Sequence, residues 1–195
     1  MATLSLIEFL TLDGVMQGFG SADEDRSGGF EHGGWGPPYA DPVLTQNAGR
    51  GLATPCAYLF GRRTYERMAA HWPHEPDSNP VAASLNSAPK YVVSATLERV
   101  DWRGTTVLRG NPRQSVAELR RQSPLPLVVL GSGELAQTLL DAELVDELNV
   151  FIHPLLLGSG RRLFGATQRP QRLTLLDCTP TTTGVLLVRY AVMAQ

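Results

Sequence analysis

The sequence predicts an α/β domain with a mainly parallel central sheet, helices on both faces and an antiparallel pair of strands at its C-terminal end. Apolar runs of strand length alternate with helical segments over residues 4–153, which is typical of parallel sheets covered on two faces. The run Leu127–Leu130 is apolar without alternation, as in a strand buried on both faces. The last two apolar segments, about 172–177 and 184–193, have no helical stretch between them, so we expect them to pair antiparallel at the sheet edge.

The expected elements follow one another without a repeat, a low-complexity tract or a linker, so residues 1–195 are interpreted as a single domain. We expect helices over 41–52, from Arg62, from Ser115 and after Gly133. Ser115 with Glu118 fits the S-x-x-E capping box that marks a helix start. The expected strands are 4–10, 57–60, 90–94, 105–108, 127–130 and 147–153.

Composition excludes several classes of function. The chain is 43% apolar and 18% charged with a net charge of −2, so it has the means to bury a core and no basic field for nucleic acid or an anionic membrane. Lys90 is its one lysine, so a side chain that contacts phosphate is expected to be arginine. Cys56 and Cys178 form no C-x-x-C pair and are interpreted as reduced cysteines. We expect a cytoplasmic protein.

Residues 18–38 form a long stretch rich in glycine and charge (GFGSADEDRSGGFEHGGWGPP). It is too long for an idle connection, so it is interpreted as either an active-site flap or a disordered loop. We call this stretch the flap below.

The sharpest local signal for a ligand is the junction of a buried strand with a helix at Gly131-Ser132-Gly133. Unpaired N–H groups at a helix start carry partial positive charge and bind phosphate, and glycines allow close approach. The string matches G-x-G-x-x-A, but no acidic residue ends the next strand, where a dinucleotide fold of the Rossmann type would hold a ribose. A tight turn without a ligand is the alternative. Glu134 on the first turn either satisfies the helix dipole or neighbours the ligand.

Two further strand ends carry groups that suit phosphate. Gly61-Arg62-Arg63-Thr64 again joins a strand to a helix, and cations at a helix start are unfavourable unless an anion lies between them and the backbone. Hydroxyl groups follow the 90–94 strand, from Ser94 to Thr96. Ligands bind beyond the carboxyl ends of strands in open α/β sheets, so these positions are consistent with one site. Surface arginines without a ligand are the alternative.

These segments resemble a known family. Thr11-Leu12-Asp13-Gly14 is similar to the S-L-D-G motif in the reductase domain of bifunctional riboflavin enzymes, the RibD C-terminal domain. The run from Phe60 to Glu66 (FGRRTYE) is similar to the segment of dihydrofolate reductase that binds the NADPH phosphates, and residues 131–164 resemble the C-terminal half of the riboflavin reductase. The chain resembles stand-alone bacterial relatives of this family over nearly its whole length, which implies a dihydrofolate reductase-like fold and a homodimer.

The resemblance also implies which residues bind NADPH. Arg62, Arg63 and Thr64, which follow Gly61, would hold the adenosine 2′-phosphate or the pyrophosphate, with Ser94 assisting. The residues around the pyrophosphate and the nicotinamide ribose would be Gly131, Ser132, Gly133, Glu134 and Leu135. Cations near the 2′-phosphate are also what a preference for NADPH over NADH requires.

The expected chemistry is hydride transfer, in which the protein orients the substrate and supplies a proton. Asp13 is the candidate for that role, with a plain Asp-Gly turn as the alternative. In the flap, His32 and Trp35 could close over the substrate and exclude water, and His32 is also a possible proton donor. His71, His74 and His153 share no metal spacing, so no metal is expected. The deaminase motif of the bifunctional enzyme, H-x-E with P-C-x-x-C, is absent from the sequence.

The substrate stays open at this point. Folate reduction would need a carboxylate on the helix before residue 61, and Asp41 lies several residues too early. A ribose phosphate would need cations, for which Arg50, Arg161 and Arg162 are available. The leading hypothesis is an NADPH-dependent reductase of a small heterocyclic or carbonyl substrate. The alternatives are the 5-amino-6-(5-phosphoribosylamino)uracil reductase of riboflavin biosynthesis and a non-catalytic sensor that binds NADP.

Overall fold

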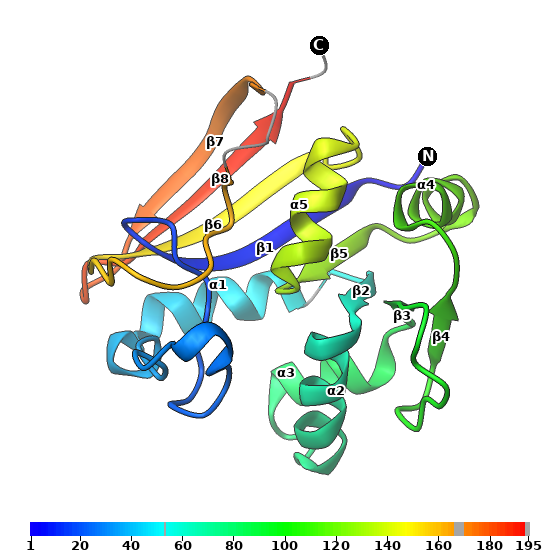
Figure 1. Ribbon diagram of the computed structural model, residues 1–195, viewed down its shortest axis with the longest axis horizontal. Helices are drawn as coiled ribbons and strands as arrows, with labels where there is room; N and C mark the ends of the chain where they lie inside the picture. The colour runs from blue at the N-terminus through cyan, green and yellow to red at the C-terminus, as the bar shows by residue number, and fades with distance from the viewer. Residues whose placement is uncertain (53, 166–169, 194–195) are drawn as a thin grey trace.

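The structure is a computed structural model that describes residues 1–52, 54–165 and 170–193. Its centre is an eight-stranded sheet in the order β4-β3-β2-β5-β1-β6-β8-β7 (Figure 1). The strands from β4 to β6 run parallel, whereas β8 pairs antiparallel with both β6 and β7. This arrangement confirms the predicted fold class. The strands are β1 Leu4–Thr11, β2 Ala57–Gly61, β3 Lys90–Val93, β4 Thr105–Leu108, β5 Leu127–Leu130, β6 Glu147–His153, β7 Leu173–Pro180 and β8 Leu186–Val192.

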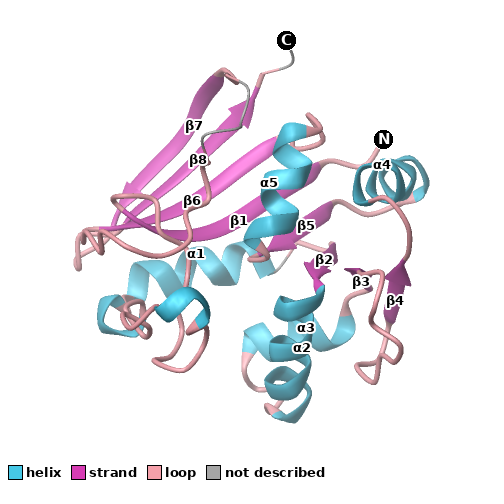
Figure 2. Cartoon of the chain, in the orientation of Figure 1, coloured by secondary structure: helices cyan, strands magenta, loops and turns pink. Residues whose placement is uncertain are grey.

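Five helices accompany this sheet in the described part of the chain, together with short 3-10 turns (Figure 2). They are α1 Pro42–Leu52, α2 Arg62–His71, α3 Pro80–Ser87, α4 Pro112–Gln122 and α5 Gly133–Asp141. None of the described helices is long and apolar enough to cross a membrane.

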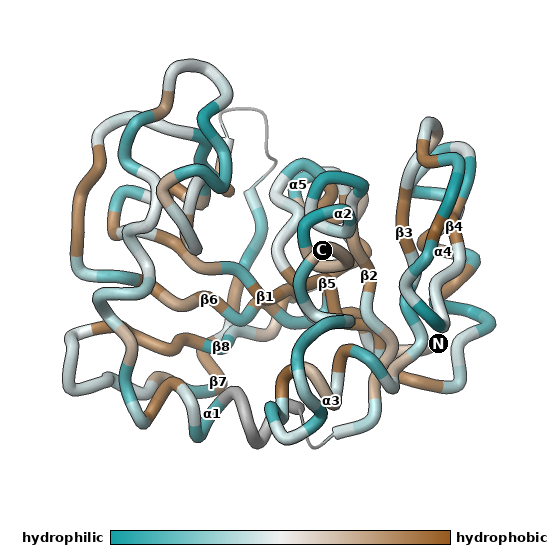
Figure 3. Tube along the Cα trace, turned by 90° about the horizontal axis from the view of Figure 1, so that it is seen from below, coloured by the Kyte–Doolittle hydropathy of each residue, from teal (hydrophilic) through white to brown (hydrophobic). Residues whose placement is uncertain are grey.

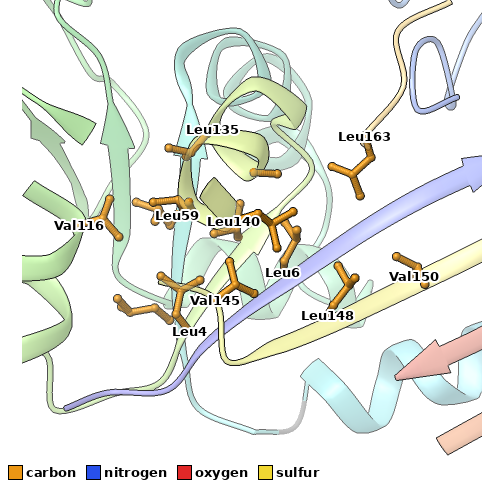
Figure 4. Packing of buried hydrophobic residues seen from close by; sticks show 14 of the residues in the cluster. Leu4, Leu6, Leu59, Val116, Leu135, Leu140, Val145, Leu148, Val150 and Leu163 are labelled. Atoms are coloured by element: carbon orange, nitrogen blue, oxygen red, sulfur yellow. The ribbon is translucent and has the colours of Figure 1, made fainter. Parts of the chain in front are cut away.

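Two apolar clusters hold the layers together. The larger one joins β1, β5 and β6 to α4 and α5, and Figure 4 shows Leu4 and Leu6 of β1 facing Leu135 and Leu140 of α5. The smaller one contains Phe60 of β2, Tyr65 of α2 and Leu85 of α3. The hydropathy trace of Figure 3 accordingly shows apolar colour along β1 and β6 and hydrophilic colour over much of α2. The sheet is therefore covered on both faces, as its continuous apolar strands require.

The predicted start of α4 was wrong by three residues. The helix begins at Pro112, and the side chain of Asn111 caps it by accepting a hydrogen bond from the Arg113 N–H at 2.9 Å. Asparagine is as good a cap as serine, and proline is favoured in the first turn of a helix, so the helix begins at the earlier of the two signals. Ser115 lies inside the helix, where its hydroxyl donates to the Pro112 carbonyl at 3.4 Å.

The helix α3 was not predicted from the sequence, and the only lysine secures its end. Lys90 is buried, and its Nζ donates hydrogen bonds to the carbonyls of Leu85 and Ala88, both at 2.7 Å. The ammonium group also lies 4.8 Å from the centre of the Trp102 ring. A cation at a helix C-terminus satisfies unpaired carbonyls and the negative end of the dipole, so a buried lysine is stable on β3.

Strand β7, at the end of the sheet order, leaves an apolar surface uncovered. β7 is one edge of the sheet, and nearly all of its side chains are exposed, on both faces. Leu173, Leu175 and Leu176 are three exposed large apolar residues on this one strand. An apolar edge strand offers unpaired N–H and C=O groups to a further chain, so the homodimer expected from the resemblance stays a prediction with a candidate surface.

We expect β7 to be covered by a second copy of this chain in solution. Leu175, which is 55% exposed, is then buried in the dimer, and Leu175→Lys should shift sedimentation velocity profiles from dimer to monomer because it places a charge in an apolar interface. Leu156→Lys is the control, since Leu156 is 70% exposed and follows β6 rather than lying on β7. A wild-type protein that is monomeric at every concentration would contradict the prediction.

Candidate functional site

The two predicted phosphate-binding helix starts lie side by side. β2 and β5 are parallel neighbours in the sheet, so α2 and α5 both begin at the carboxyl ends of these strands, along the same edge of the sheet. The Gly61 N–H donates a hydrogen bond of 2.8 Å to the hydroxyl oxygen of Ser132. This bond joins the two strand-to-helix junctions, which are 71 residues apart in sequence. The structure thus brings the groups that the sequence singled out separately into one place.

The loop at the start of α5 has an unusual backbone. Gly131 and Ser132 both adopt positive φ angles, 62° and 70°. For a residue with a side chain this conformation costs about 1–2 kcal/mol, and strain of this kind persists at sites where other contacts hold it. The Gly61 bond holds Ser132 on one side, and on the other the Gly131 N–H donates to the Ile7 carbonyl of β1 at 3.0 Å. The loop is therefore fixed between β2 and β1.

Two arginines in the first turn of α2, Arg62 and Arg63, have carboxylate partners only at 3.5 Å or more. Arg62 lies 3.5 Å from Glu66 of its own helix, and Arg63 lies 4.0 Å from Glu134. Glu134 lies in the first turn of α5 and is also 4.0 Å from Arg161. Its carboxylate is mostly exposed, so these pairs are weak. Arg62 and Arg63, the two arginines in the first turn of α2, are therefore available to an anion at the helix starts.

The remaining predicted cofactor residues have packing roles. Thr64 lies against the loop, with its methyl carbon 3.5 Å from the position that a Cβ on Gly131 would take. Leu135 is buried against the core, and its Cβ lies 3.8 Å from the corresponding position on Gly61. The Ser94 hydroxyl oxygen accepts hydrogen bonds from the N–H groups of Thr96 and Leu97, at 3.2 and 2.9 Å. Ser94 thus follows β3, on the side of β2 away from β1.

Asp13 holds a loop together at the end of β1. Its carboxylate accepts hydrogen bonds from the Thr11 hydroxyl at 2.6 Å and the Gly158 N–H at 2.9 Å, and Arg162 lies 3.2 Å away. These hydrogen bonds, the Thr11 one foremost, lower the pKa of Asp13 to about 2. Asp13 is therefore ionised at neutral pH, when it can accept a hydrogen bond but has no proton to give. Its role toward a substrate stays a prediction.

The flap is ordered and packed in this structure. Trp35 is buried, its indole N–H donates to the Gln17 carbonyl at 2.8 Å, and its ring lies 5.0 Å from that of His153 at the end of β6. His32 is exposed and contacts Phe30 edge-on, with the ring centres 5.8 Å apart. Trp35 thus anchors the flap to the sheet, whereas His32 lies on its solvent side. Closure of these residues over a substrate stays a prediction.

The sequence left open whether Asp41 and the arginines 50, 161 and 162 reach a substrate, and those whose side chains the structure describes are already paired within the protein. Arg161 forms an ion pair with Asp25 of the flap, and Arg162 pairs with Asp13. Asp41 caps α1 by accepting from the Val43 N–H at 2.6 Å, and it accepts hydrogen bonds from Thr182 in the β7–β8 turn, whose hydroxyl lowers the pKa of Asp41. The side chain of Arg50 lies outside the described residues.

Sequence reasoning missed two residues beside the junction. Met16 packs on the loop, and its sulfur and terminal methyl group occupy the place that a Cβ on Gly133 would take. Glu8 of β1 is 5% exposed, and its Oε1 has no hydrogen-bond partner among the described residues. Burial, with the nearby charge of Glu24 as a smaller cause, raises the pKa of Glu8 to about 8. The available signal was one acid inside the apolar run LSLIEFL.

The fold defines a class of protein, the dihydrofolate reductase-like α/β domains, and in this chain two helix starts are joined at one end of its sheet. Within that class, the chain belongs to the RibD C-terminal domain family, whose model matches residues 2–187. It is also similar to the uncharacterized protein YyaP of Bacillus subtilis (strain 168), with 27% identity over 135 residues that cover 68% of this chain and 71% of YyaP.

Solved structures share the fold at low sequence identity. A candidate riboflavin biosynthesis protein from Shewanella sp. PV-4 superposes with a TM-score of 0.69 at 18% identity and full coverage of both chains. A pyrimidine reductase-like protein from Corynebacterium diphtheriae NCTC gives 0.62 at 13% identity, covering all of this chain and 93% of the other. RibD of Acinetobacter baumannii gives 0.64 at 16% identity, and all of this chain spans 59% of its length. The likeness extends over the whole chain in each case.

We expect Ser132→Ala to destabilise the protein by about 1–2 kcal/mol, because it leaves the Gly61 N–H without its partner. Ser132→Gly loses the same bond but relieves the positive φ, so its cost should be smaller by about 1 kcal/mol. Urea unfolding of the two variants measures the difference. Equal destabilisation by both variants would show that the backbone of Ser132 is not strained.

The raised pKa of Glu8 predicts that stability falls as pH rises. Between the usual pKa of 4.5 and the folded value of about 8, the folded protein keeps a proton that the unfolded chain has lost. The contribution of neutral Glu8 to the free energy of unfolding is therefore fully present below pH 4.5. It falls by up to about 1.4 kcal/mol per pH unit as the pH rises toward 8. Glu8→Gln should reduce this slope in urea unfolding at pH 5.5, 6.5 and 7.5. Parallel pH dependence in both proteins would contradict the assignment.

Proposed function

We propose that the protein is an NADPH-dependent reductase that transfers a hydride to a small heterocyclic or carbonyl substrate. The observation that carries this proposal is the pair of helix starts joined by the Gly61–Ser132 hydrogen bond, with Arg62 and Arg63 beside them. Two helix N-termini and two cations at one sheet edge suit the several negative charges of a dinucleotide phosphate tail. Membership of the RibD C-terminal domain family supports the same proposal.

The positions of the cations give the cofactor a direction. Arg62 and Arg63 belong to α2, which follows β2, whereas β1 lies on the other side of β5. The 2′-phosphate end of NADPH would therefore lie toward β2 and Ser94, and the nicotinamide end toward β1. Met16 covers Gly133 on this path, and its unbranched side chain has the rotational freedom to move aside.

The protein's own contribution is binding, orientation and exclusion of water, while bound NADPH supplies the hydride. Arg62, Arg63 and the N–H groups of the two helix starts would hold the phosphates. The flap, anchored by Trp35, would shield the nicotinamide end from solvent. Asp13 is ionised at neutral pH, so its role would be to orient a substrate donor group rather than to give a proton.

The ion pairs favour an unphosphorylated substrate over the phosphoribosylaminopyrimidine of riboflavin biosynthesis. Arg161 and Arg162 are paired with Asp25 and Asp13, so a substrate phosphate would have to displace a carboxylate from each. Complementation of a riboflavin auxotroph that lacks the reductase tests this alternative. Growth would assign the riboflavin substrate, and no growth with NADPH binding intact would favour another acceptor. A sensor would bind NADPH and leave it unoxidised, whichever acceptor is offered.

NADPH should bind more tightly than NADH, by tenfold or more, because charge-assisted hydrogen bonds to the 2′-phosphate contribute about 1.5–3 kcal/mol. Substitution of both Arg62 and Arg63 by alanine should narrow this difference, whereas Arg99→Ala should not, since Arg99 is an exposed residue paired only loosely with Asp101 at 3.9 Å. Fluorescence titration with each dinucleotide gives the affinities. Equal affinity of the wild type for both would refute the 2′-phosphate assignment.

A further inference from the structure

Glu8 is a buried acid whose position calls for a partner. Among the described residues, its Oε1 is the buried side-chain oxygen that lacks any hydrogen bond. Buried polar atoms are nearly always paired, and an exception in a folded protein needs an explanation. A ligand that completes the pairing is such an explanation where the atom borders a binding site.

Strand register places Glu8 at the candidate site. Ile7 pairs with Leu130 of β5, so the next residue, Glu8, lies level with Gly131 at the start of the α5 loop. Side chains alternate along β1, and Leu6 and Leu10 belong to the core cluster beneath α5. Glu8 lies between them and thus points to the face of the sheet that carries α5. It is therefore on the side where the nicotinamide end of the cofactor would arrive.

The charged surroundings of Glu8 come from the flap. Glu24 is the residue whose negative charge acts on it, and Glu24 is itself 3.4 Å from Arg67 of α2. The partner of Glu8 in β6 is Val150, and Gly131 follows the last pair of β1 with β5, Ile7 with Leu130; neither residue titrates. Burial and the charge of Glu24 both oppose ionisation, so Glu8 keeps its proton while no cation lies beside it.

We propose that Glu8 lies against the nicotinamide ring, holds a proton while that ring is reduced, and releases it when the ring is oxidised. This inference rests on the proposed function. The reduced ring is uncharged and leaves Glu8 in the environment that favours its neutral form. The oxidised ring is a cation, and a cation next to a buried carboxyl group stabilises the carboxylate. Glu8 thereby distinguishes the two redox states of the cofactor.

The proton balance of hydride transfer fits this role. The C4–H bond of NADPH breaks, and the hydride forms a new C–H bond on the acceptor carbon. The π electron pair of the acceptor C=O or C=N moves to its heteroatom, which takes a proton. Glu8 supplies that proton in the same step by breaking its O–H bond, so the positive charge gained by the ring is matched by the carboxylate left on Glu8. Glu8 regains a proton from water when NADP⁺ leaves.

The test is the pH dependence of the affinities for NADPH and NADP⁺, measured by titration calorimetry from pH 6.5 to 9.5. In the wild type, the ratio of the affinity for NADP⁺ to the affinity for NADPH should increase with pH. The increase should reach up to tenfold per pH unit in the range where Glu8 is neutral in the NADPH complex and ionised in the NADP⁺ complex. Both dinucleotides carry the same phosphates, so other titrations largely cancel in the ratio. In Glu8→Gln the ratio should be independent of pH.

Two further variants complete the design. Glu31→Gln is the matched control, because Glu31 is an exposed acid of the same flap, and it should keep the wild-type profile. Glu24→Gln removes a charge that opposes ionisation of Glu8. The pH range over which the ratio of the two affinities changes should therefore move to lower pH in this variant. This variant decides the matter if Glu8→Gln does not fold.

The outcomes separate this inference from the proposed function. Saturable binding of both dinucleotides with a ratio that does not change with pH, or that changes equally in Glu8→Gln, overturns the role of Glu8 and leaves the reductase proposal standing. No saturable binding of either dinucleotide at any pH overturns the proposed function, and the inference with it.

Discussion

The hydrogen bond from the Gly61 N–H to the Ser132 hydroxyl is the contact on which the arrangement of the site depends. It fixes the start of α2 relative to the start of α5, so the unpaired N–H groups of two helices face the same edge of the sheet. It also holds Ser132 in a backbone conformation that a residue with a side chain rarely adopts. An interaction of this kind stabilises two loops at once.

Ion pairs fix the flap and the 157–162 loop around that edge. Asp25 and Glu24 of the flap pair with Arg161 and Arg67, which belong to the 157–162 loop and to α2. Asp13 binds the 157–162 loop itself, through the Gly158 N–H and Arg162. Because these arginines are engaged in this way, the cations left for an anionic ligand at this end of the sheet are Arg62 and Arg63 in the first turn of α2. Charge pairing therefore limits which end of a ligand is recognised by arginine.

The sequence was sufficient for the features that are local. Strand, glycine and helix follow directly at Gly61 and Gly131, so the junctions and the parallel sheet could be predicted from periodicity and turn residues. The start of α4 was mistaken because two local signals, Asn111-Pro112 and Ser115-x-x-Glu118, competed within one segment. The contacts that define the site are not local. Asp13 meets Gly158 across 145 residues, which only the folded chain brings together.

Glu8 and Asp13 show how far environment separates two carboxyl groups on one strand and its turn. Desolvation raises the pKa of Glu8 to about 8, whereas hydrogen bonds lower the pKa of Asp13 to about 2. Two acids whose pKa values are driven apart in this way divide the roles of proton holder and permanent anion between them. The motif that drew attention in the sequence, Asp13-Gly14, contains the permanent anion. The proton is held five residues earlier, at a position that looked like part of an ordinary buried strand, because burial itself is what keeps it there.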